Sequence, residues 1–139
     1  MDTISKDRRS WNMSQIKGKN TKPEILVRSS LHKMGYRFRL HDKNLPGTPD
    51  IVLPKYKTVI LIHGCFWHRH RDCKFSYNPK SHTDFWFKKF NDTIDRDKNN
   101  YRLLLNEGWL PLVLWECEIK ASLESVLIKI ETFLNNRIK

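Results

Sequence analysis

The stretch TVILIHGCFWHRHRDC, residues 58–73, joins an apolar segment to a loop crowded with reactive side chains. Its first five residues are β-branched or aliphatic, which is the composition of a strand buried in a sheet. Gly64 then ends the segment, and the loop that follows holds two cysteines, two histidines, two arginines and a Phe-Trp pair. The stretch therefore predicts a buried strand whose end carries residues for metal binding, substrate contact or catalysis.

The segments on either side of this stretch predict further helices and strands. The TKPE segment (residues 21–24) matches a capping box with an early proline, and Gly35 is a suitable residue to end the helix that follows. Strands are predicted over residues 36–41, 50–53, 58–63 and 109–116. Helices are predicted over about 21–34, over 84–107 with Ser81 or Thr83 as the cap, and from Ser122 onward. The order α-β-β-β-α-β-α predicts an α/β sandwich around a small mixed sheet.

Length and charge narrow the class of protein. A chain of 139 residues is enough for one core, and we expect a single domain over residues 1–139, with residues 1–20 as a basic arm or short helix. The net charge of +11 favours a polyanion as partner, with nucleic acid as the first candidate. No apolar run approaches the ~20 residues of a membrane span, and the start lacks a secretory h-region. We therefore expect a cytoplasmic protein that makes no membrane contact.

The three cysteines are candidate metal ligands. A reducing compartment disfavours disulfides, and three thiols cannot all pair with one another. Cys65 and Cys73 lie in the loop, and Cys117 follows the last predicted strand. With one histidine they form the closed thiolate and imidazole set that zinc binds in structural sites. Spacing alone admits either His68 or His70 as the fourth ligand, and three unrelated free thiols are the alternative.

Two carboxylates stand where apolar side chains are expected. On the long helix, Asp97 shares a face with the aromatic or aliphatic residues Phe90, Ile94, Tyr101 and Leu104. A buried acid needs a partner because loss of water disfavours its charge, and either a salt bridge or a nearby histidine would supply one. The second acid, Asp50, begins an apolar strand. It is either a turn residue or a ligand for a hard divalent cation, of the kind that assists phosphodiester cleavage.

Four segments, taken in order, resemble the very short patch repair (Vsr) endonuclease family. They are MSQIKGKNTKPE from residue 13, GYRFRLHDKNLPGTPDIVLPKYKTVILIHGCFWHRHRDC from residue 35, FWFKKFNDTIDRD from residue 85 and GWLPLVLWECE from residue 108. The resemblance spans roughly residues 11–119 and implies a restriction-endonuclease-like fold. It also implies an enzyme that nicks double-stranded DNA 5′ of the thymine in T:G mismatches, which arise when 5-methylcytosine deaminates. Such a protein would act as a monomer, with mismatch-repair proteins as further partners.

The resemblance implies catalytic roles for individual residues. Asp50 would bind the essential magnesium ion, and the backbone carbonyl of Ile62 would be a second ligand. His63 and His68 would act on water and protons, with His68 as the general base. Asp97 would support this network by orienting a histidine or a metal-bound water.

The same resemblance places the zinc ligands and one further acid. The structural zinc would be held by Cys65, His70, Cys73 and Cys117, so that His70 is preferred to His68. Glu24 would lie near the active site, although its place in the capping box explains it equally well. Residues 58–63 lack the acid-x-Lys pair of related restriction enzymes, which agrees with the use of histidine in the Vsr family.

Aromatic and basic residues would contact the DNA. Phe66, Trp67 and Trp86 would form an aromatic wedge, which unstacks a base step most cheaply where the bases are mispaired. The further predicted contacts are Met13, Arg69, Arg71, Lys88 and Lys89. Two other functions stay open: a restriction-type endonuclease of another specificity, and a zinc-stapled DNA-binding module without catalysis. The missing acid-x-Lys argues against the first, and the two acids on apolar elements argue against the second.

Overall fold

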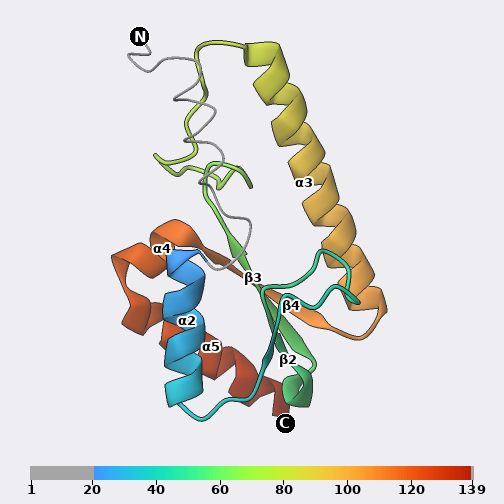
Figure 1. Cartoon of the computed structure of the whole chain (residues 1–139), viewed down its shortest axis with the longest axis vertical. Coiled ribbons are helices and arrows are strands. Elements are labelled where there is room, and N and C mark those ends of the chain that lie inside the picture. Colours follow the sequence, from blue (N-terminus) through green and yellow to red (C-terminus); the bar gives the residue numbers. More distant parts are fainter. Residues whose placement is uncertain (1–20, 139) are drawn as a thin grey trace.

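The centre of the molecule is a mixed sheet of four strands in the order β1-β2-β3-β4 (Figure 1). The computed structural model describes residues 21–138. The strands are β1 (Arg39–Leu40), β2 (Ile51–Leu53), β3 (Thr58–His63) and β4 (Leu110–Trp115). The first three pair antiparallel, whereas β3 and β4 pair parallel. The predicted small mixed sheet is therefore confirmed, while the predicted arm over residues 1–20, with Met13, lies outside the described residues.

Helices cover both faces of the sheet. They are α2 (Lys22–Lys33), α3 (Thr83–Asn106), α4 (Glu116–Ala121) and α5 (Leu123–Ile138), and a 3-10 turn, η1 (Pro54–Tyr56), joins β2 to β3. Figure 1 shows α2, α4 and α5 gathered on one side of the sheet and α3 on the other. The far end of α3 extends well past the strands, so this helix is only partly supported by the core. Among the described residues, no helix combines the length and the apolar character that a membrane crossing requires.

Alternate side chains of the strands point to the two helical layers. On one face, Ile51, Leu53 and Ile60 belong to a core cluster with residues of α2, α4 and α5. On the other face, Val52 and Val59 pack with Leu104 of α3 and with Trp109. Because the side-chain period of a strand is two, β2 and the buried part of β3 need apolar residues at successive positions to fill both layers. This burial explains the continuous apolar run at residues 59–62.

The helix ends agree with the sequence only in part. Thr21 caps α2 by accepting a hydrogen bond from the Glu24 N–H at 3.4 Å, and Gly35 follows the helix at φ +92°, as predicted. The predicted cap of α3 is wrong: His82 precedes the helix at φ 53°, and no side chain caps it. Neither Ser81 nor Thr83 takes that role, because the chain enters α3 through a left-handed turn.

Two further elements differ from prediction. β1 holds only Arg39–Leu40, although a strand was expected over residues 36–41. The alternation there is still meaningful, since Tyr36 and Phe38 pack against the core without sheet pairing. Helix α4 was not predicted at all; it begins directly after β4 and turns the chain towards α5.

Candidate active site and metal centre

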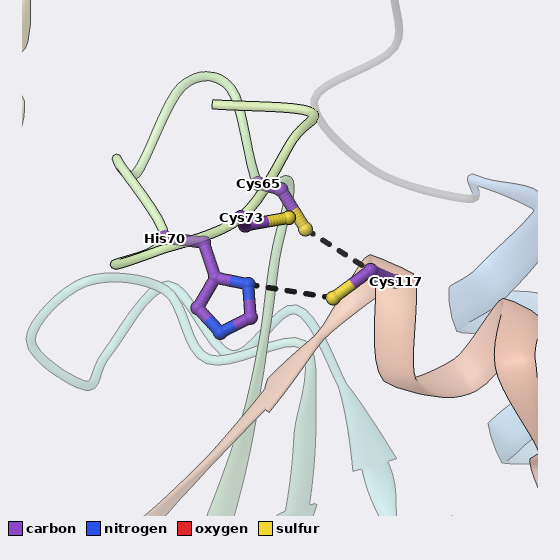
Figure 2. Close-up of side chains that lie close together, drawn as sticks. All are labelled: Cys65, His70, Cys73 and Cys117. Atoms are coloured by element: carbon purple, nitrogen blue, oxygen red, sulfur yellow. Dashed lines mark hydrogen bonds between the residues drawn. The ribbon is translucent and has the colours of Figure 1, made fainter. Parts of the chain in front are cut away.

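The ends of β3 and β4 bring the reactive residues together. The parallel register places His63 beside Trp115, so the loop after β3 and the start of α4 leave the sheet at the same edge. There, Cys65, His70, Cys73 and Cys117 converge, with their ligand atoms all within 4.8 Å of one another. Figure 2 shows Cys117 reaching across from α4 towards the three loop residues. Its Sγ lies 3.4 Å from His70 Nδ1, and its N–H donates to Cys65 Sγ at 3.4 Å.

This cluster has the chemistry of a closed metal site. Three thiols and one imidazole are a complete tetrahedral set. Burial raises the pKa of the Cys65 thiol to about 12, and the thiols of Cys117 and Cys73 add to the increase. A bound cation would reverse this effect, because it stabilises the thiolate form. The four residues could therefore hold a metal ion, and their convergence argues against three unrelated thiols.

His68 points to a different group from His70, although only one residue separates them. Arg69 between them has φ 54°, a left-handed conformation that sends successive side chains in different directions. His68 Nδ1 lies 2.6 Å from Asp97 Oδ2 on α3. Spacing leaves the choice between the two histidines open, whereas in the structure His70 joins the cysteines and His68 joins Asp97.

His63 and His68 form a stacked pair beside Asp97. Their ring centroids are 3.9 Å apart and their planes differ by 7°. Burial lowers the pKa of His63 to about 4, and the nearby His68 lowers it further while Asp97 opposes the change. His63 is therefore neutral at neutral pH. With the carboxylate on Nδ1 of His68, the Nε2 atom of that ring is the one suited to accept a proton.

Asp50 is the centre of a second cluster, on the opposite side of the same opening. Its Oδ2 accepts a hydrogen bond from the Ile62 N–H at 2.7 Å, which ties the start of β2 to the end of β3. Glu24 and His41 lie close enough to share one cation with it. Burial raises the pKa of Asp50 to about 7; the Ile62 hydrogen bond lowers it, and the neighbouring Glu24 raises it again.

Glu24 is almost fully buried and is held by two basic side chains. Arg28 Nη1 lies 2.8 Å from one of its oxygens, and His41 Nε2 lies 2.9 and 3.0 Å from the two oxygens. His41 was not predicted as a site residue, because it closes the alternating segment at residues 36–41 and carries no signal of its own. Its φ of 48° turns the chain towards Asp50, whose carbonyl accepts the His41 N–H.

The His63–His68–Asp97 group and the cluster around Asp50 open into one cleft of about 700 Å³. One wall is the segment from His41 to Asp50, and the other is the middle of α3. The end of β3, with His63, forms the floor between them. A carboxylate suited to a hard cation and a carboxylate–histidine pair suited to proton transfer thus face the same space.

Comparison with known proteins identifies the family. Residues 1–75 match the model of the family described as DNA mismatch endonuclease Vsr. The chain is 49% identical over 118 residues to the type II nicking enzyme V.XorIIP of Xanthomonas oryzae pv. oryzae, covering 85% of this chain and 86% of the relative. It is 39% identical over 119 residues to DNA mismatch endonuclease Vsr of Escherichia coli, covering 86% of this chain and 76% of the relative. The chain belongs to the Vsr family of DNA endonucleases. This finding confirms the resemblance seen in the sequence.

The aromatic residues of this Vsr-family chain pack against one another beside the cleft. Phe66 lies at their centre, with ring centroids 5.2 Å from Trp67, 5.5 Å from Trp86 and 5.3 Å from Phe90. All three predicted wedge rings are therefore half-buried, whereas Phe85 and Phe87 on the same helix are exposed. The wedge stays a prediction, and its three rings form one packed group.

Arg69 makes contacts that differ from those predicted. Its guanidinium donates to the backbone carbonyls of Phe66, Ser76 and Tyr77 and to the Asn78 side chain, at 2.7 to 3.3 Å. It also lies 3.8 Å above the Phe90 ring. These contacts hold the loop on α3, and the DNA contact of Arg69 stays a prediction. The other predicted basic contacts, Arg71, Lys88 and Lys89, are exposed.

Because burial raises the pKa of Asp50 to about 7, stability should depend on pH. The stabilisation by the Asp50 proton is complete below the unfolded pKa of about 4 and is lost as pH rises towards 7, by up to about 1.4 kcal/mol for each pH unit. Asp50→Asn should therefore gain stability relative to the wild type as pH rises from about 4 to about 8. Thermal unfolding without added magnesium measures this, with Asp92→Asn on the exposed face of α3 as the control. Equal pH slopes for wild type and Asp50→Asn would contradict it.

Proposed function

We propose that this protein is a magnesium-dependent endonuclease that nicks one strand of double-stranded DNA 5′ of the thymine in a T:G mismatch, and so starts the repair of deaminated 5-methylcytosine. The observation that carries the proposal is the single cleft in which Asp50 faces the His68–Asp97 pair. A mixed sheet flanked by helices agrees with a restriction-endonuclease-like fold. The names of the relatives support the mismatched substrate and the cutting of one strand, since one relative is a DNA mismatch endonuclease and another is a nicking enzyme.

The oxygen donors around Asp50 fit a magnesium ion. Asp50 is a mostly buried carboxylate with a second carboxylate, Glu24, beside it, and such hard oxygen ligands are those that magnesium prefers. Asp50 and the backbone carbonyl of Ile62 would hold the ion, and Glu24 would lie behind them. When bound, magnesium supplies positive charge to the phosphate and to the departing oxygen.

The histidine pair would handle the proton of the attacking water. Asp97 accepts the hydrogen bond from His68 Nδ1, which leaves the lone pair of the neutral ring on Nε2. His68 Nε2 can then accept a proton as the water attacks. His63, kept neutral by burial, stacks on His68 and fixes the plane of its ring.

Variants of the cleft should separate the two tasks. Asp50→Asn should abolish nicking but retain DNA binding, because it removes the charge that holds the cation. His68→Ala should lower the nicking rate by roughly 10²–10⁴-fold, as loss of a general base does. The nicking rate of Asp97→Asn should lie between those of the wild type and His68→Ala. Single-turnover nicking of a T:G duplex with magnesium measures each rate, and Asp92→Asn on the same helix should match wild type. An Asp50→Asn protein that nicks at the wild-type rate would refute the proposed mechanism.

The substrate is tested with a panel of duplexes. Duplexes with a T:G mismatch in several flanking sequences should be cut in the thymine strand alone. The matched C:G duplexes are the controls and should not be cut. Cutting of both strands would favour a restriction-type endonuclease instead. Binding without any cutting in every sequence context would favour a DNA-binding module.

We also propose that the ion at the three cysteines and His70 is zinc. The support is the donor set, since three thiolates and one imidazole around one point form a structural zinc site. A binding free energy on the order of 10 kcal/mol would let the ion stabilise a loop that has no helix or strand of its own.

Two histidine variants test the zinc site. His70→Ala should lose the metal and lower the melting temperature, whereas His68→Ala should keep one equivalent. Elemental analysis of protein purified without added zinc gives the stoichiometry, and thermal unfolding gives the stability. Equal zinc content in the two variants would refute the assignment of His70, and an absence of zinc in wild type would refute the site.

The aromatic wedge should act on mismatch preference. Trp67→Ala should weaken binding to T:G duplexes more than to C:G duplexes, because ring insertion is cheapest at a mispaired step. Lys88→Gln should weaken binding to both duplexes alike and flatten its salt dependence, as loss of a phosphate contact does. Fluorescence anisotropy without magnesium measures both affinities. Equal loss of preference in the two variants would contradict this division.

A further inference from the structure

The two walls of the cleft approach each other closely at one point. Gly47 stands in the wall formed by residues 41–50, at φ +75°. A Cβ atom added there would lie 3.0 Å from Asn100 Nδ2 and 3.2 Å from Asn100 Cβ, so the wall touches α3 directly at this point. The two walls are therefore in contact at this point before any substrate binds.

The α3 wall presents one stripe of polar residues to the cleft. Thr93, Arg96, Asp97 and Asn100 follow one another at steps of three, one and three, which places them on one side of the helix, and all four line the cavity. Within residues 21–138, the Arg96 side chain makes no hydrogen bond or ion pair, although Asp92 lies four residues before it. Its charge is therefore available to the cleft and is not taken up by a neighbour on the helix.

The opposite wall carries a matching cation. Lys43 is exposed, lines the cavity, and likewise has no ion-pair partner in the described part of the chain. The acid next to it, Asp42, is used otherwise: its side chain accepts from the Asn44 N–H at 3.0 Å and pairs with Arg39 at 3.4 Å. Most lysine and arginine side chains of the described residues likewise have no acidic partner, so what sets Lys43 and Arg96 apart is that both line the cleft.

The cleft needs such cations for an anionic substrate. Asp50 and Asp97 stand on its two sides, and their charges repel a phosphodiester backbone that approaches between them. Unpaired lysine and arginine side chains are what proteins use to bind and position DNA phosphates. We propose that Lys43 and Arg96 form a two-sided clamp on the backbone of the strand that is cut, each contacting a different phosphate near the catalytic residues. The clamp rests on the proposed function, since it presumes a DNA strand in this cleft.

The clamp would not distinguish one base sequence from another. Phosphate contacts fix position and register and are shared by all duplexes. Arg96→Gln and Lys43→Gln should each raise the dissociation constant about 10-fold for T:G and C:G duplexes alike. Each should also reduce the slope of log affinity against log salt by about one. Lys98→Gln, on the same helix with the same charge change but outside the cleft, should leave affinity within about twofold of wild type.

Neutral phosphates then locate each contact. Single methylphosphonates are placed at successive positions of the thymine strand around the nick, and anisotropy is measured without magnesium. At the phosphate that Arg96 contacts, the neutral substitution should weaken DNA binding by the wild type but should not weaken binding by Arg96→Gln any further. Lys43→Gln should behave in the same way at a different phosphate. If Arg96→Gln or Lys43→Gln binds like Lys98→Gln, or if no neutral position removes its effect, the clamp is wrong. Failure of wild type to nick any T:G duplex would instead overturn the proposed function, whatever the binding data show.

Discussion

The parallel pairing of β3 with β4 is the constraint on which the rest of the structure depends. Parallel strands send the segments that follow them out at the same edge of the sheet. In this register His63 lies beside Trp115, so Cys117, two residues further, meets a loop that is distant in the sequence. A slip of one residue would turn each side chain of β4 to the other face and separate the thiols. A slip would also exchange the apolar residues of both strands between the two helical layers, so that neither core would keep its packing.

One short loop supplies residues to both the Cys65–His70–Cys73–Cys117 cluster and the His68–Asp97 pair. The left-handed conformation of Arg69 lets His68 and His70 point to different groups. The Trp115 ring stacks on His70 at 4.2 Å and meets the edge of His63 at 5.2 Å, so a single indole packs against both sites. Residues 64–82 contain no helix or strand, and the contacts that hold them include those among Cys65, His70 and Cys117 and the hydrogen bonds of Arg69. The position of His68 therefore depends on the same loop that carries the candidate metal ligands.

The sequence predicted what depends on local pattern or on a shared motif. Apolar runs located β2, β3 and β4, the capping box located α2, and the position of Asp97 on an apolar face indicated that it had a partner. It could not predict features that arise from distant contacts. His41 binds Glu24 from a turn with no periodic signature, and Arg69 lies above the ring of Phe90, which is on another element. The different directions of His68 and His70 depend on a single left-handed residue, which spacing does not reveal.

Glu24, Asp50 and Asp97 each have a hydrogen-bond partner within the protein before any DNA arrives. Glu24 is held by Arg28 and His41, and Asp97 is paired with His68. Asp50 forms no ion pair with any described residue, and its raised pKa means that a proton partly takes that place near neutral pH. Glu24 is the buried member of the three, and its carboxylate would cost several kcal/mol to bury without these partners. Because the acids are satisfied in this way, the basic side chains on the cleft walls are not drawn into internal ion pairs. A cleft built from carboxylates can therefore still attract a polyanion, and exchange of the Asp50 proton for a divalent cation is the step that would raise its positive charge further.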